Sequence, residues 1–209
     1  MKRFLAPILL MVFLFPSLAL GLEMDDLVIR EGLYYEKFTD VPFSGTIDEG
    51  LERGSFKDGK KDGPWVNYNE DEQLSSEGTF KDGKREGLWV WYYDNGQLWM
   101  KGTYKDGKAD GPSVSYWDNG QVWEKGTYKD GNLEGLWVWY YDNGQLSSEE
   151  TYKDGKADGP SVNYHDNGQL SSEGTYKDGE KDGPWVNYNE DGTVDYARTG
   201  TYRDGVKVE

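Results

Sequence analysis

The chain of 209 residues has no cysteine, a single histidine and few basic side chains, and each scarcity excludes a class of protein. Without cysteine there is no disulfide framework, no thiolate metal site and no cysteine nucleophile. Lys and Arg number 23 against 39 Asp and Glu, which gives a net charge of −16. Such a charge repels the phosphates of nucleic acids and the headgroups of anionic membranes, so neither is an expected partner.

Aliphatic side chains are also scarce. Leu, Ile, Val and Phe make up about 19% of the chain, and this share with a high net charge is typical of intrinsic disorder. However, the 9 Trp and 16 Tyr are far too many large rings for a solvated tail. Composition is therefore consistent both with disorder and with a folded, aromatic-rich chain, and only the order of the residues distinguishes the two.

Residues 1–21 have the features of a secretory signal peptide. Lys2 and Arg3 precede an apolar run over residues 4–20, and the small residues Ala19 and Gly21 stand just before an acidic stretch. These features predict cleavage after Gly21 and export to the periplasm or the extracellular space. The alternative is an uncleaved leader that anchors the protein in the inner membrane, because the apolar run nearly reaches spanning length.

The rest of the chain consists largely of tandem copies of one sequence motif. The tripeptide Lys-Asp-Gly recurs every 24 residues, beginning at Lys57, Lys81, Lys105, Lys129, Lys153 and Lys177, with Arg203-Asp204-Gly205 as a late seventh copy. A fixed period of this size indicates stacked supersecondary units. We therefore divide the chain into the leader, a degenerate lead-in (22–53), six full repeats plus a partial seventh (54–205), and a C-terminal tail (206–209).

Each repeat contains two turn signals separated by runs of strand length. Asn-Gly, as in Asp94-Asn95-Gly96, predicts a tight hairpin in which both central residues have positive φ. The second signal, as over residues 105–111, predicts a longer Gly- and Asp-rich turn. No segment after the leader has helical periodicity. The predicted fold is all-β: an elongated antiparallel β-meander of tandem 24-residue β-hairpin repeats.

Alternation along the strands predicts two different faces. Val and Tyr recur at fixed positions, as at Val90 and Tyr92, whereas the positions between them vary among Trp, Ser and Asn. In the second strand we expect Leu98, Gly102 and Tyr104 to lie on the Val face, which would put all Trp on the other. Glu150 replaces the repeated Gly once, and the sequence alone does not explain it.

The varying face carries the candidate binding residues. They are the aromatic side chains of the central repeats: Trp89, Trp91, Tyr93, Trp99, Trp117, Trp123, Trp137, Trp139 and Tyr141. Large apolar patches usually mark contact sites. The alternative is that these rings only form cross-strand packing pairs, each contributing about 0.2–1 kcal/mol.

No motif predicts catalysis or a cofactor. His165 occupies a position held by Asn, Tyr or Trp in other repeats, so we expect a surface residue and no base or metal ligand. Paired aspartates such as Asp106 and Asp110 recur with the turns and fit turn chemistry. Residues 187–192 match the opening of a calcium loop, but Arg198 stands where Glu is required. We expect no enzyme and no cofactor, with weak calcium association by clustered carboxylates as the alternative.

The repeat unit G-T-Y-K-D-G-K-x-D-G-P-W-V-x-Y-x-D-N-G-Q-L resembles the bacterial MORN-repeat variant, as found in YwqK-family antitoxins. The resemblance covers residues 54–205, and residues 30–45 look like that family's degenerate lead-in. It implies consecutive β-hairpins in an elongated sheet. For function it implies binding, because the family name invokes toxin neutralisation and MORN repeats elsewhere act as protein or membrane contact modules.

Three functions follow from these observations. The leading hypothesis is an exported, non-enzymatic scaffold that binds a protein partner through its aromatic face. The second is a carbohydrate- or cell-wall-binding module, in which exposed rings would stack on sugars. The third is a cytosolic antitoxin, which requires an uncleaved leader and therefore conflicts with predicted export.

Overall fold

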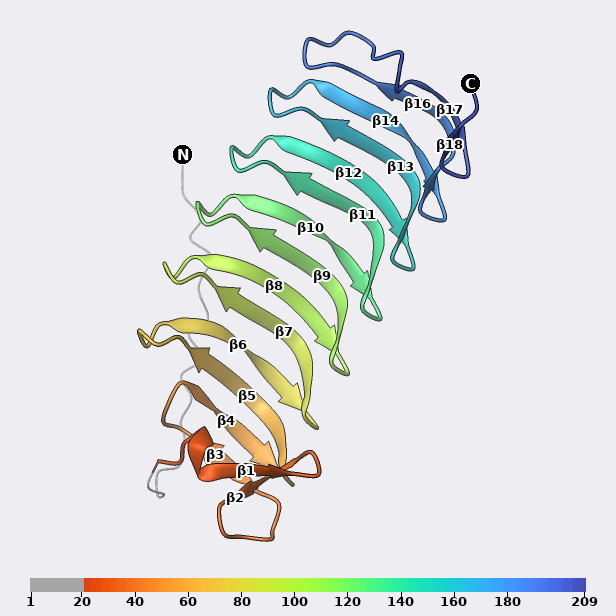
Figure 1. The fold of residues 1–209 in the computed structure, drawn as a ribbon. Helices are drawn as coiled ribbons and strands as arrows, with labels where there is room; N and C mark the ends of the chain where they lie inside the picture. The colour runs from red at the N-terminus through yellow and green to blue at the C-terminus, as the bar shows by residue number, and fades with distance from the viewer. Residues whose placement is uncertain (1–20) are drawn as a thin grey trace, which may run out of the picture.

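The computed structural model describes residues 21–209, and it is built almost entirely of strands that follow one another along an elongated array (Figure 1). Except for Gly21, the predicted secretory leader lies outside the described residues. A short 3-10 helix, η1 (Met24–Asp26), precedes a separate two-stranded sheet of β1 (Leu27–Arg30) and β2 (Leu33–Glu36). Within residues 21–209, no helix is long and apolar enough to cross a membrane.

All later strands belong to one antiparallel sheet, which confirms the predicted meander. Each long strand pairs with its neighbours in sequence, and β15 pairs only with β14. The strands are β3 (Gly45–Ile47), β4 (Glu52–Lys57), β5 (Lys60–Tyr68), β6 (Leu74–Lys81), β7 (Lys84–Tyr92), β8 (Leu98–Lys105), β9 (Lys108–Tyr116), β10 (Val122–Lys129), β11 (Asn132–Tyr140), β12 (Leu146–Lys153), β13 (Lys156–Tyr164), β14 (Leu170–Lys177), β15 (Glu180–Lys181), β16 (Gly183–Asn187), β17 (Gly200–Arg203) and β18 (Val206–Lys207).

The Lys-Asp-Gly turn is the tight one, contrary to the prediction. Lys57 pairs with Lys60, so the loop consists of Asp58 and Gly59 alone, with φ values of 50° and 76°. Two positive φ values in a two-residue loop define a type I′ turn, whose twist matches the flanking strands. The second Asp-Gly or Glu-Gly of the motif, which we expected in the same loop, lies inside the following long strand, except that Asp182 falls between β15 and β16.

The Asn-Gly turn is longer than predicted. Five residues, 93–97, connect β7 to β8, and of Asn95 and Gly96 only the glycine has positive φ (78°). The Asn95 side chain instead accepts the Gln97 amide at 2.9 Å and donates to the Asp118 carbonyl at 3.3 Å. Asparagine is therefore placed here to close its own turn and to join it to the turn of the next repeat.

A bulge in every repeat bends the long strands, as Figure 1 shows along the whole array. Gly54 pairs with Trp65 and Phe56 pairs with Lys61, so Ser55 alone lies opposite residues 62–64. Bulges of this kind bend a strand and increase its twist. Because the bulge recurs at the same repeat position, successive strands bend together and stay in register.

The register corrects the predicted grouping of residues on the two faces. Trp89 pairs with Gly102 and Val90 pairs with Lys101, and directly paired residues lie on the same face. Gly102 and Tyr104 therefore share the Trp face, where we had placed them with Val90. The expectation was wrong because alternation within each strand does not reveal how the two strands pair.

Rings just after the first strand join neighbouring repeats along most of the array. The Tyr93 hydroxyl donates to the Tyr116 carbonyl at 2.7 Å, and the Trp117 indole donates to the Tyr140 carbonyl at 3.2 Å. Nε2 of half-buried His165 lies 3.1 Å from the carbonyl oxygen 23 residues ahead, as in the three preceding repeats, whereas Asn69 donates to the Asp94 side chain instead. This slot accepts any ring with a hydrogen-bond donor, which explains why His165 replaces Tyr.

Candidate binding surface on the aromatic face

The aromatic face, defined by the Trp residues that four repeats carry in their first strand, is built on glycine. Trp65, Trp89, Trp137 and Trp185 are 1–2% exposed. Each ring lies over a glycine of the preceding strand, and a Cβ atom on Gly126 would lie only 2.3 Å from the Trp137 ring. Glycine is required there because the ring occupies the space of a side chain.

Two repeats have serine in place of this tryptophan, and that difference explains Glu150. A Cβ atom on Gly102 would meet Ser113 at 3.5 Å, which is ordinary van der Waals contact. Glu150 pairs with Ser161, the other serine. A side chain is therefore tolerated at position 150 because the next repeat contributes no ring to cover it.

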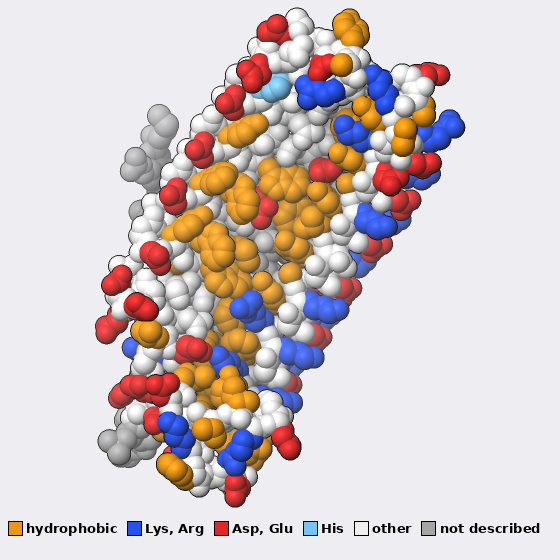
Figure 2. Space-filling model, in the orientation of Figure 1, with side chains coloured by type: hydrophobic (Ala, Val, Ile, Leu, Met, Phe, Trp, Pro, Cys, Tyr) orange, Lys and Arg blue, Asp and Glu red, His pale blue; other side chains and the backbone are white. Residues whose placement is uncertain are grey.

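The structure divides the predicted contact residues into two groups. Trp89 and Trp137 are only 1% exposed, so they form the base of the face and present no surface to a partner. Trp99 and Trp123 are 42% and 37% exposed. The other members, which are half-buried, are Trp91, Tyr93, Trp117, Trp139 and Tyr141. In Figure 2 the hydrophobic side chains gather in a patch along the middle of the visible face.

The central part of this face is hollowed. Trp117, Trp123 and Trp139 contribute to an open hollow of about 460 Å³, together with Tyr141, Glu150 and other residues of β11 and β12. The Trp117 and Trp123 rings are 5.5 Å apart between centroids. The structure thus brings together three of the predicted tryptophans from neighbouring repeats, whereas Trp99 contacts Tyr93 in the preceding turn.

Sequence reasoning did not place two carboxylates of this region in the candidate site. Glu124 accepts hydrogen bonds from the Trp139 indole (3.0 Å) and the Ser115 hydroxyl (3.2 Å). Glu150 accepts one from the Tyr152 hydroxyl at 2.9 Å. Burial, then this hydrogen bond and the carboxylate charge, raises the pKa of Tyr152. The departure of both residues from the repeat pattern was the available signal.

Basic side chains cover the aromatic face towards both ends of the array. Nζ of Lys61 lies 3.9 Å from the Trp65 ring centroid, and Nζ of Lys181 lies 4.1 Å from that of Trp185. The Arg85 guanidinium lies 4.9 Å from the Trp89 centroid. The central repeats have uncharged residues at this position, namely Ala109, Leu133 and Ala157. The centre of the face therefore combines rings and carboxylates without a cation from its own strand position.

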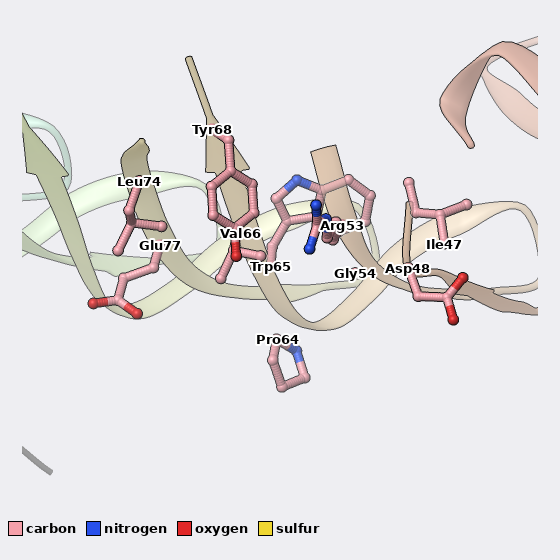
Figure 3. Close-up of a pocket in the computed structure, with 10 residues that line it drawn as sticks. All are labelled: Ile47, Asp48, Arg53, Gly54, Pro64, Trp65, Val66, Tyr68, Leu74 and Glu77. Carbon is pink, nitrogen blue, oxygen red and sulfur yellow. The ribbon is translucent and has the colours of Figure 1, made fainter. Parts of the chain in front are cut away.

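The opposite face is less aromatic. Val66 pairs with Arg53 and with Glu77, and these residues line part of a hollow of about 410 Å³ near the N-terminal end (Figure 3). The Arg53 guanidinium lies 4.6 Å from the Tyr68 ring centroid. Across residues 21–209, no group of three or more His, Cys, Asp or Glu side chains is arranged to hold a metal ion.

Comparison with known proteins identifies the repeats. The sequence profile described as "MORN repeat variant" matches residues 61–82, 85–106, 109–130, 133–154 and 157–178. No curated protein matches the chain. A solved structure described as "Crystal structure of GtfA/B complex bound to UDP and GlcNAc" is similar at 13% identity and a TM-score of 0.18. The match covers 64% of this chain and 24% of that one, so the chain spans about a quarter of its length.

Proposed function

Since the chain belongs to the MORN repeat variant family, we propose that it is an exported, non-enzymatic scaffold that binds a protein partner through its aromatic face. The observation that carries this proposal is the exposure of Trp99 and Trp123, of which Trp123 lines the hollow at Trp139. Aromatic side chains dominate the energetics of protein interfaces. Repeats that contact only their neighbours also present a long surface whose shape does not depend on a single core.

The test uses substitutions that the repeats themselves supply. Trp99 and Trp123 occupy a position where other repeats have serine, as at Ser147, so replacing both with Ser preserves the repeat pattern. The matched control changes Leu88 and Leu136, which are 57% and 55% exposed, to the Pro found at that position in other repeats. Leu88 and Leu136 pair with Thr103 and Thr151 on the opposite face.

A protein that co-purifies with the exported wild type should be lost from the Trp variant and kept by the Leu variant. Equal retention by two folded variants would refute the assignment to the aromatic face. Sequencing the mature N-terminus after cell fractionation tests export. An intact leader, together with rescue of growth when a neighbouring toxin gene is co-expressed, would favour a cytosolic antitoxin instead.

A carbohydrate or cell-wall ligand is the second candidate. The observation that favours it is the pair of half-buried Trp117 and exposed Trp123, which line one hollow together with Glu150. Rings stack on sugar faces while carboxylates accept hydroxyl hydrogen bonds. Saturable binding in a glycan and peptidoglycan screen, abolished by the Trp variant, would establish this function in place of the first.

A further inference from the structure

Two repeats contain the same trio of rings in the same arrangement. In the first trio, Trp89 and Trp91 have ring centroids 5.8 Å apart at an interplanar angle of 31°, and Tyr104 lies 5.8 Å from Trp91. In the second trio the corresponding residues are Trp137, Trp139 and Tyr152, with separations of 6.0 and 6.1 Å and the same 31° angle. The trios are therefore matched sites within one molecule.

The first trio already holds a cation. The Arg85 guanidinium carbon lies 4.9, 5.3 and 5.5 Å from the centroids of Trp89, Trp91 and Tyr104. A guanidinium within about 6 Å of a ring centroid is attracted to the negative face of the ring. This geometry shows that the arrangement of rings accommodates one planar cation.

Three replacements change the charge around the second trio. Leu133 stands where the first trio has Arg85. Leu133 pairs with Tyr128 in the same way that Arg85 pairs with Phe80. Glu124 pairs with Trp139 as Ser76 pairs with Trp91. Glu150 pairs with Trp137 as Gly102 pairs with Trp89. One positive charge has been lost and two negative charges have been gained around equivalent rings.

We propose that Trp139 and Tyr152 of the second trio form, together with Glu150, a pocket for an arginine side chain of the partner protein, with buried Trp137 as its base. Trp139, Tyr152 and Glu150 line the same open hollow, so a guanidinium entering it can lie against the rings beside the carboxylate. Tyr152 donates to Oε2 of Glu150, which leaves Oε1 to accept from the incoming side chain. Arginine suits the site better than lysine because a guanidinium both stacks on rings and donates to carboxylates.

This inference rests on the proposed function, since it names the chemistry by which a protein partner is recognised. The two ideas are nevertheless separable. The pocket can be tested with a short arginine peptide, whereas partner binding depends on the whole aromatic face.

The probe is the peptide Ac-Gly-Arg-Gly-NH2, with its citrulline counterpart as an uncharged control of nearly the same shape. Binding to the full chain is measured by NMR from the indole N–H signals of Trp139 and Trp123. Wild type should bind the arginine peptide at least about tenfold more tightly than the citrulline peptide, as expected for a hydrogen bond between charged groups.

Three variants locate the binding. Glu150→Gly restores the residue found at this position in other repeats and should weaken arginine binding about tenfold. Leu133→Arg should abolish it by placing a guanidinium on the trio, as Arg85 does in the first. Glu149→Gln is the control, because it also removes one negative charge, but its residue pairs with Val138 and Val162 on the opposite face.

The proposal is overturned if wild type does not distinguish arginine from citrulline, or if Glu149→Gln weakens binding as much as Glu150→Gly. It is also overturned if the co-purifying partner is lost from the Trp99/Trp123 variant but is fully kept by Leu133→Arg. That result would leave the proposed function standing. Specific arginine binding, with no effect of any aromatic-face variant on the partner, would refute the proposed function instead.

Discussion

Two kinds of repeat make up the sheet, and they differ in what covers the middle of the aromatic face. Four repeats place a buried Trp on a glycine of the preceding strand, whereas the repeats with Ser113 and Ser161 have no ring there. The Trp repeats provide most of the buried apolar volume. The Ser repeats lack this buried ring. In one of them, Ser161 pairs with Glu150, whose carboxylate lies on the aromatic face. Whether the next strand contributes Trp or Ser thus decides whether the residue opposite it must be glycine or can be a carboxylate.

The largest effect should come from filling the space under a ring. Gly126→Ala brings a Cβ atom within 2.3 Å of the Trp137 ring, which is 1% exposed and cannot move aside. We expect a loss of about 3 kcal/mol in the free energy of unfolding. Gly102→Ala, beside Ser113, should change it by less than about 0.5 kcal/mol. Urea denaturation of both variants measures the contrast, and equal losses would contradict the Trp-on-Gly account.

The next effect tests whether Glu150 depends on Ser161. Ser161→Trp should destabilise the wild type, because the new ring must occupy the space of the Glu150 side chain. In the Glu150→Gly background the same substitution recreates the Trp-on-Gly pair of the other repeats and should be tolerated. The double-mutant cycle should therefore give a coupling energy of about 2 kcal/mol. Additive effects of the two substitutions would show that the residues are independent.

The fold could be predicted from the sequence, but the two faces of the sheet and the turn lengths could not. The 24-residue period and the turn residues were enough to predict the meander, because each hairpin is specified locally. The faces were not predictable, since the bulge between Gly102 and Tyr104 changes the pairing within a strand. The lengths of the two turns were interchanged because Asp-Gly and Asn-Gly both favour type I′ loops.

The candidate site was predicted in outline only. The exposed rings Trp99 and Trp123 follow from their positions in the repeat, but the burial of Trp89 and Trp137 depends on glycines in another strand. Glu150 was visible as an exception without an explanation. Comparing each strand with the next strand, and not each repeat with the consensus, would have connected Glu150 with Ser161.

A smaller effect is expected in the slot that joins neighbouring repeats. His165→Tyr restores the residue of the repeats at Tyr93 and Tyr141, whose hydroxyls each donate to the next repeat at 2.7 Å. Its stability should equal that of the wild type. His165→Leu keeps an apolar side chain but removes the contact with the Tyr188 carbonyl, which should cost about 1 kcal/mol. Thermal denaturation compares the two variants, and equal stability would assign the slot to packing alone.

The smallest effect concerns the protonation of Tyr152, whose hydroxyl donates to Glu150, the carboxylate paired with Ser161. Burial, the hydrogen bond to Glu150 and its charge raise the pKa of Tyr152 above its ordinary value near 10. Glu150→Gly removes the hydrogen bond and the carboxylate charge but leaves burial and the charge of Tyr176, so the pKa should fall while staying above that ordinary value. The near-ultraviolet absorbance of tyrosinate measures this, with Tyr152→Phe in each background to isolate the signal.

The raised pKa of Tyr152 also predicts how the free energy of unfolding changes with pH, because proton binding and folding are linked. Because the folded state holds the Tyr152 proton more tightly than the unfolded state, its contribution is complete below about pH 10 and is lost as the pH rises through the folded-state pKa. The wild type should therefore lose more stability than Glu150→Gly over this alkaline range. The pKa of Tyr128 is raised by burial and then by the charge of Glu124, so it should not change in the Glu150→Gly variant. A pKa of Tyr152 that does not change would mean that Glu150 points away from the aromatic face and is unavailable to a guanidinium.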